Sequence, residues 1–233
     1  MLFRKIKDQT VIRTYKAFTL IEILVVIFIG TIILLSISNL LNNFYFNQYK
    51  KEKLFNLQKQ SHQIINYLQQ NIQHLAYQGD YREQSNVELF SDNDQHYFLN
   101  KRCFVFFYDL NGDGCIGNRN KTKSCKLHKS NKTKEISKEF FGFKFENNMI
   151  YVFENKSIDN CVGEYCQEYL SNCQTGKWRK MSDLADYTVE NLTFSWKNEG
   201  SLLHIHLITS TAKDKKLTYE LNSYVYILNG KEK

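Results

Sequence analysis

Glu22 is an acidic residue inside a strongly apolar stretch, and its position indicates chemistry at a membrane. Residues 18–41 carry no other charge. An ionised carboxylate in a membrane span costs about 2 to 3 kcal/mol at the helix centre and less near the interface, so such residues usually have a partner. A cut before Phe18 would create that partner, because the new α-amino group is a cation that Glu22 of an adjoining subunit can neutralise. The alternative is that Glu22 reaches the cytoplasmic interface of a simple signal anchor.

The element that positions Glu22 is a helix long enough to cross a bilayer. At 1.5 Å per residue, residues 18–41 span about 36 Å, against a hydrocarbon thickness of roughly 30 Å. The preceding residues 1–17 carry a net charge of +4 out of +7 for the chain. The positive-inside rule therefore predicts a cytoplasmic N-terminus and an exported remainder. That remainder is only mildly basic, so bulk charge predicts no nucleic-acid partner.

The helix is expected to continue as an amphipathic half over residues 42–78 and to stop at Gly79. Its apolar residues recur at three- and four-residue steps among Lys, Gln and Asn, which is the pattern of a helix with one buried face. The apolar residues are Leu54, Leu57, Ile64, Ile65, Leu68, Ile72 and Leu75.

The chain is 42% hydrophobic and contains no proline. This composition excludes collagenous, low-complexity and fully disordered classes.

From about residue 87 the apolar period changes to two, which predicts strands. Strands are expected over residues 97–109, 141–145, 149–154, 191–197, 202–209 and 217–227. Asn147-Asn148 and residues 198–200 are suited to hairpin turns. Residues 79–233, hereafter the head, are thus predicted to form an antiparallel sheet laid on the amphipathic half of the helix, an α+β fold without a separate second domain.

Six cysteines lie after the apolar stretch. An even number on the exported side predicts three disulfides in an oxidising compartment, although six cysteines allow 15 pairings. Zinc is the rival reading, and the absence of any CxxC pair in the sequence weakens it. The cysteines are Cys103, Cys115, Cys125, Cys161, Cys166 and Cys173.

The segment from Lys16 to Glu22 resembles the class III signal of type IV pilins and pseudopilins. It combines a basic leader, a small residue, Phe and a Glu at the expected offset. The family has Gly before the cut, whereas this chain has Ala17. The resemblance implies cleavage between Ala17 and Phe18 by an inner-membrane prepilin peptidase, N-methylation of Phe18, a role for Glu22 in assembly, and a lollipop shape.

The head resembles minor pilins of the PilW and prepilin peptidase-dependent protein B kind. The resemblance lies in residues 103–114 (CFVFFYDLNGDG), residues 141–146 (FGFKFE) and Cys173 ahead of Gly176-Lys177-Trp178. It implies that Cys103 pairs with Cys173, which leaves Cys115 with Cys125 and Cys161 with Cys166 as local loops.

A short acidic motif predicts a calcium site. Asp109, Asn111, Asp113 and Gly114 match the opening of a calcium loop, D-x-N-x-D-G, but Asn120 stands where the closing Glu belongs. A further oxygen ligand would have to come from elsewhere. The alternative is a turn rich in Asp and Asn at a strand end. No other cofactor is predicted.

A run of basic residues follows this motif without an intervening acid. A solvated loop is the default interpretation, and contact with DNA phosphates is the alternative, since some pili of this type take up DNA. No interleaved aromatics are present to stack on bases. The residues are Arg119, Lys121, Lys123, Lys126, Lys129, Lys132 and Lys134.

The function implied by the resemblance is assembly rather than catalysis. No carboxylate pair, Ser-His-Asp set or glycine-rich phosphate loop is evident in the sequence, so no enzyme is predicted. We expect a minor pilin of a type IV pilus, held in the inner membrane with its head in the periplasm and then placed in the filament. Its partners would be prepilin peptidase, other major and minor pilins, and the inner-membrane assembly platform. The alternatives are a type II secretion minor pseudopilin and an uncleaved signal-anchored periplasmic binding protein.

Overall fold

A computed structural model describes residues 18–79, 85–91, 95–119, 124–161, 163–181, 187–212 and 215–229. The leader residues 1–17, including Ala17, therefore lie outside the described residues. The chain divides into two compact units, Met1–Lys51 and Glu52–Lys233.

The described part of the first unit is the N-terminal portion of helix α1 (Leu20–Ile72). Its side chains from Leu20 to Lys51 are exposed apart from half-buried Gly30. Among the described residues, α1 is the one helix whose length and composition suit a membrane span, and the most apolar part of it is not buried within the chain. Contiguous exposed apolar side chains at this density require lipid or another protein as cover.

In the second unit, the C-terminal part of α1 carries a buried stripe. Leu57, Ser61, Ile64, Ile65, Leu68 and Ile72 are buried at the spacing of one helix face. The helix ends at Ile72, earlier than the predicted Gln78. The physical reason is a tertiary contact: Ala76 adopts a left-handed conformation with φ of 60°, and its N–H donates to the Phe107 carbonyl at 3.3 Å. This bond draws the chain away from the helix axis.

A five-stranded antiparallel sheet has the order β1-β2-β5-β6-β7. Its strands are β1 (Tyr97–Asn100), β2 (Cys103–Phe107), β5 (Phe140–Glu146), β6 (Met149–Phe153) and β7 (Trp178–Lys180). The single strand predicted over 97–109 is instead a hairpin, because a turn at residues 101–102 separates β1 from β2. The predicted turn at Asn147 and Asn148 is confirmed, since both residues have positive φ, as the favoured two-residue hairpin turn requires.

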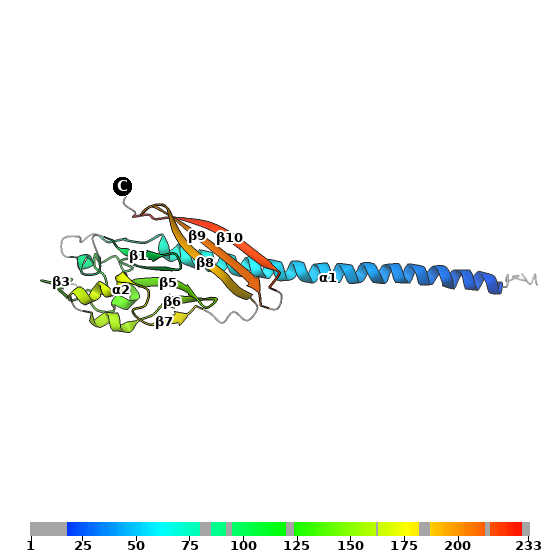
Figure 1. Ribbon diagram of the computed structural model, residues 1–233, viewed down its shortest axis with the longest axis horizontal. Helices are drawn as coiled ribbons and strands as arrows, with labels where there is room; N and C mark the ends of the chain where they lie inside the picture. The colour runs from blue at the N-terminus through cyan, green and yellow to red at the C-terminus, as the bar shows by residue number, and fades with distance from the viewer. Residues whose placement is uncertain are drawn as a thin grey trace, which may run out of the picture. The chain divides into compact units, whose positions relative to one another are not determined.

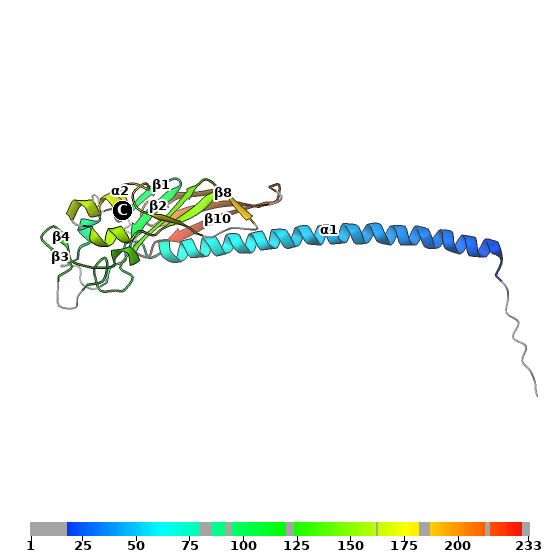
Figure 2. The same ribbon diagram turned by 90° about the horizontal axis from the view of Figure 1, so that it is seen from below.

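A separate three-stranded sheet has the order β10-β9-β8. Its strands are β8 (Tyr187–Asn198), β9 (Leu202–Thr211) and β10 (Thr218–Tyr226). The predicted single sheet is thus two sheets. Both views show β8 and β10 alongside the C-terminal part of α1 (Figures 1 and 2). The shorter elements are β3 (Lys126–Leu127), β4 (Ser130–Asn131), α2 (Glu168–Ser171) and the 3-10 turns Val87–Leu89, Ile136–Lys138, Lys156–Asn160 and Gly163–Cys166.

The five-stranded sheet separates two hydrophobic cores. Phe104 and Phe106 of β2 belong to the core shared with α1 and the three-stranded sheet. Cys103, Val105 and Phe107 belong to a second core under the short 3-10 turns and α2. Alternate residues of a strand face opposite sides, so an apolar run such as Cys103–Phe107 marks a strand that is covered on both faces.

Candidate functional site

The candidate site is the first turn of α1, where Thr19 and Glu22 bond each other reciprocally. The Thr19 backbone N–H and its hydroxyl both donate to Glu22 Oε2 at 2.9 Å, and the Glu22 N–H donates to the Thr19 hydroxyl at 3.4 Å. This is a capping box, which satisfies N–H groups that the first turn of a helix leaves free. The sequence signal was Thr-x-x-Glu ahead of an apolar run, and the sequence reasoning above missed it.

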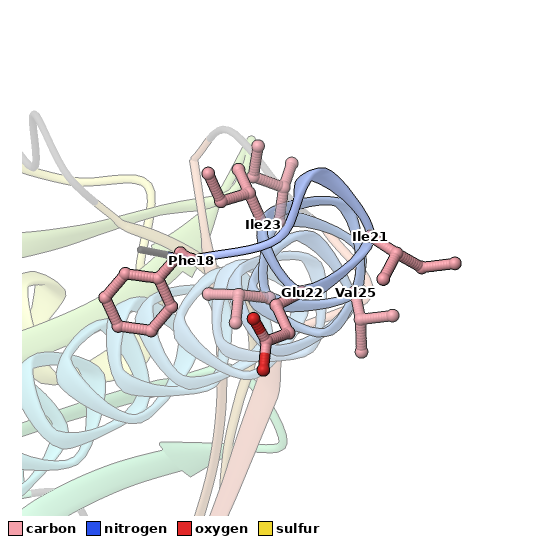
Figure 3. A pocket seen from close by; sticks show the side chains of 7 residues that line it. Phe18, Ile21, Glu22, Ile23 and Val25 are labelled. Atoms are coloured by element: carbon pink, nitrogen blue, oxygen red, sulfur yellow. The ribbon is translucent and has the colours of Figure 1, made fainter. Parts of the chain in front are cut away.

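The Glu22 carboxylate shares this turn with exposed apolar side chains. Phe18, Ile21, Glu22, Ile23, Val25, Val26 and Ile27 line a shallow open groove. Figure 3 shows the Phe18 ring, the Ile21 side chain and the Glu22 carboxylate projecting in different directions around the turn. Phe18 is 82% exposed. Because Phe18 is directly before the capping residue, a new amine on Phe18 would arise beside the cap that already holds Glu22.

The six cysteines form three disulfides. Cys103 bonds Cys173, Cys115 bonds Cys125, and Cys161 bonds Cys166, which are the pairs that the resemblance implied. The first bond closes a loop with a sequence separation of 70 and ties β2 to the segment before β7.

The predicted calcium motif is a turn whose carboxylates accept backbone N–H groups. Asp109 is 1% exposed. Its Oδ1 accepts from Gly112 and Asp113, and its Oδ2 accepts from Gly79 and Gly114. A Cβ at Gly79 would lie 2.4 Å from the Gly112 carbonyl oxygen, so this packing demands glycine. Among the described residues no group of three or more His, Cys, Asp or Glu is arranged to hold a metal ion. Calcium binding here stays a prediction.

Sequence reasoning also missed Glu139, which reaches this turn from the segment before β5. The side chain is buried, and its carboxylate accepts N–H bonds from Asn111 at 3.2 Å and from Gly117 at 2.5 Å. Burial raises the pKa of Glu139 to about 7, with the charges of Asp109 and Asp113 acting in the same direction and the two N–H donors opposing them. Nothing near Glu139 in the sequence indicates this contact, because its partners are 22 or more residues away.

The predicted basic cluster is only partly described. Lys121 and Lys123 lie outside the described residues. Lys126 forms an ion pair with Glu88. The Asp113 carboxylate accepts the Arg119 N–H at 3.0 Å, so Arg119 is tied to the turn through its backbone. Lys129, Lys132 and Lys134 are exposed. Among the residues of this cluster that the structure describes, these three lysines are the exposed ones.

Comparison with known proteins covers both the first turn and the head. Residues 50–227 match the family described as prepilin peptidase-dependent protein B. Residues 12–38, which contain Ala17, Phe18 and Glu22, match the prokaryotic N-terminal methylation motif. A protein of Haemophilus influenzae (strain ATCC 51907 / DSM 11121 / KW20 / Rd), described as uncharacterized, is 31% identical over an alignment of 163 residues. The match covers 64% of this chain and 68% of the relative. No solved structure gives a significant match.

Proposed function

The chain belongs to the prepilin peptidase-dependent protein B family, and from that membership we propose that it is a minor pilin of a type IV pilus. It is a membrane-anchored, prepilin peptidase-processed, pilin-like protein. In the proposed role it enters a filament beside other major and minor pilins after storage in the inner membrane, with its N-terminus in the cytoplasm and its head in the periplasm.

The observation that carries the proposal is the placement of Glu22 at an exposed apolar first turn. Hydrolysis of the Ala17–Phe18 peptide bond by prepilin peptidase leaves a carboxylate on Ala17 and an amine on Phe18, which is then N-methylated. The methylated amine remains a cation. In the stored subunit Glu22 is held by its own Thr19. In the filament the Phe18 amine of one subunit pairs with Glu22 of the next, and this charge pairing sets the register.

A Glu22→Ala variant tests the pairing. We expect normal processing, with a mature mass beginning at Phe18, and loss of the protein from sheared filaments, because no carboxylate then neutralises the incoming amine. The matched control is Thr19→Val, which removes the capping hydroxyl and keeps the acid, and we expect it to enter filaments. Normal filament incorporation of Glu22→Ala would contradict the pairing. An unprocessed mass beginning at Met1 in cells with active peptidase would instead indicate the signal-anchored binding protein.

The kind of filament is tested by deleting the gene and measuring two outputs. If the protein is a pilus subunit, deletion should abolish surface pili and leave the export of secreted enzymes normal. In that case the partners of the protein would include the inner-membrane assembly platform of the pilus. A type II secretion minor pseudopilin predicts the reverse. The measurement is filament yield from sheared cells beside enzyme activity in the culture medium.

A DNA-uptake role for the pilus would place phosphate contacts on the exposed lysines of the basic cluster. Replacing Lys129, Lys132 and Lys134 together by Gln removes three cations that phosphate contact requires. The proposed role predicts fewer transformants with unchanged filament yield. The matched control is Lys177→Gln, an exposed lysine elsewhere on the head. Unchanged transformation in the triple variant would remove the DNA contact.

A further inference from the structure

Four aromatic side chains follow directly after the apolar stretch of α1. Phe44, Tyr45, Phe46 and Tyr49 are 61%, 67%, 59% and 55% exposed, and α1 continues through them without interruption. We call these four residues the collar. More than half of each side chain is thus exposed, and exposed apolar surface at this density marks a site of membrane or protein interaction.

The collar surrounds much of the helix instead of forming one stripe. With 3.6 residues per turn, each residue advances by about 100°, so the four rings are distributed over about 200° of the circumference. A single packed protein partner selects a narrower apolar stripe, as in a helix pair. A wide distribution suits a partner that surrounds the helix, and lipid does so.

The spacing along the helix matches the layers of a bilayer. From Ile23, directly after Glu22, to Leu41 the rise is about 27 Å, close to the roughly 30 Å of the hydrocarbon layer. From Glu22 to Tyr49 the rise is about 40 Å, and a bilayer with its headgroup regions measures about 40 to 45 Å. A helix that places Glu22 in one headgroup region therefore places the collar in the other.

The polar residues around the collar have the chemistry of that boundary. Asn42, Asn43, Asn47 and Gln48 carry amides, and Lys50 and Lys51 follow immediately. The Lys50 Nζ lies 4.4 Å from the centre of the Phe46 ring, a distance suited to a cation–π contact. Aromatic rings concentrate at headgroup level in membrane helices, and lysine stems extend along apolar surface towards charged heads.

We propose that the collar binds the lipid headgroup region on the side of the membrane where the head lies, and that it fixes the depth of α1. The occupant is the boundary between phospholipid headgroups and acyl chains, continuous with the apolar span that anchors the protein. By fixing the depth, the collar holds Glu22 in the opposite headgroup region, where a charge is least costly. The proposal concerns the stored subunit and holds for a pilus or a secretion filament alike.

The test measures fluorescence quenching of a Tyr49→Trp reporter in the full chain. The protein is reconstituted in vesicles of phosphatidylethanolamine and phosphatidylglycerol that carry bromine either next to the headgroup or near the acyl chain end. The signal of Trp178 and Trp196 in the head is subtracted with the unsubstituted protein. Ile33→Trp serves as the deep control, and Gln63→Trp, an exposed position in the second unit, serves as the aqueous control.

We expect shallow bromine to quench the Tyr49→Trp reporter more than deep bromine, with the reverse order for Ile33→Trp and no quenching for Gln63→Trp. Replacing Phe44, Tyr45 and Phe46 by Ser should then weaken the depth preference of the Ile33→Trp reporter. The matched control replaces three exposed tyrosines of the second unit by Ser, namely Tyr67, Tyr224 and Tyr226. This control should leave the depth preference of the Ile33→Trp reporter unchanged.

Two outcomes would overturn the proposal. A Tyr49→Trp reporter quenched as little as Gln63→Trp would place the collar in water or against protein, and an emission maximum shifted to the blue without quenching would identify a protein partner. Quenching with the depth order of Ile33→Trp would place the collar among the acyl chains.

Discussion

The hydroxyl of Ser61 in α1 lies 2.7 Å from the hydroxyl of Thr209 in β9, and both residues are fully buried. The Ser61 hydroxyl also donates to the Leu57 carbonyl at 2.8 Å. This contact is a polar pair inside the core that joins the helix to the three-stranded sheet. A buried hydroxyl that loses its partner costs about 1 to 3 kcal/mol.

Single replacement of either hydroxyl should therefore destabilise the head, and joint replacement should cost less than the sum. We expect Ser61→Ala and Thr209→Val each to lower the free energy of unfolding by about 1 to 2 kcal/mol. The double variant removes both polar groups together, so its loss should fall short of additivity. Denaturant titration of the full chain in detergent measures all four proteins. Strict additivity would show that the two hydroxyls do not interact.

The three disulfides should differ in their contribution to stability in the order of their sequence separations, 70, 10 and 5. Loop-closure entropy predicts losses of about 4, 3 and 2 kcal/mol on removal of Cys103–Cys173, Cys115–Cys125 and Cys161–Cys166. Each bond is removed by replacing both cysteines with Ala, which leaves no free thiol. Denaturation midpoints and slopes measure the losses. An equal loss for all three pairs would contradict the entropic account.

The unfolding free energy should depend on pH through Glu139. Because its pKa is raised from 4.5 to about 7 in the folded protein, the folded state holds a proton between these values that the unfolded state has released. The stabilisation from this proton is fully present below about pH 4.5 and is lost as the pH rises to about 7, a decrease of about 3 kcal/mol. Glu139→Gln should remove this decrease, and Glu135→Gln, a nearby exposed position, should retain it. The unfolding free energy is measured as a function of pH in the presence of a metal chelator. If Glu139→Gln has the same dependence on pH as the unsubstituted protein, the prediction is contradicted.

Two substitutions in the turn around Asp109 distinguish a structural role of this turn from calcium binding. Asp109→Asn should cost about 2 to 4 kcal/mol, because an amide cannot accept all four N–H bonds that reach the buried carboxylate. Asp113→Asn should cost less, since Asp113 is only half-buried. If the calcium prediction holds, millimolar calcium raises the unfolding midpoint of the unsubstituted protein and not that of Asp113→Asn. Equal unfolding midpoints with and without calcium would show that this segment acts as a structural turn and does not bind calcium.

The elements that depend on neighbours in the sequence were predictable. Apolar spacing in α1 identified the face that is buried from Leu57 to Ile72, and Asn147-Asn148 marked a hairpin because both residues tolerate positive φ. The Thr19–Glu22 cap was equally legible as Thr-x-x-Glu, although the acid was interpreted only through a neighbouring subunit.

The elements that depend on distant contacts were not predictable. The end of α1 is decided by the bond from Ala76 to Phe107, which no pattern near Ile72 contains. The same holds for Glu139, whose role comes from amides of Asn111 and Gly117. The division into two sheets arises from pairing partners, and alternation along a strand reports which residues share a face and not which strand lies beside it.

The cysteine connectivity has a consequence for maturation. Four cysteines lie between Cys103 and its partner Cys173 in the sequence. A chain oxidised in order from its N-terminal side would therefore first join Cys103 to Cys115 and then Cys125 to Cys161. Each of these mispaired bonds occupies cysteines of two native pairs and so blocks two native bonds. Exchange between thiolates and disulfides is needed to release them. Cells that lack a disulfide isomerase should consequently accumulate scrambled, protease-sensitive protein, even when their oxidising capacity is intact.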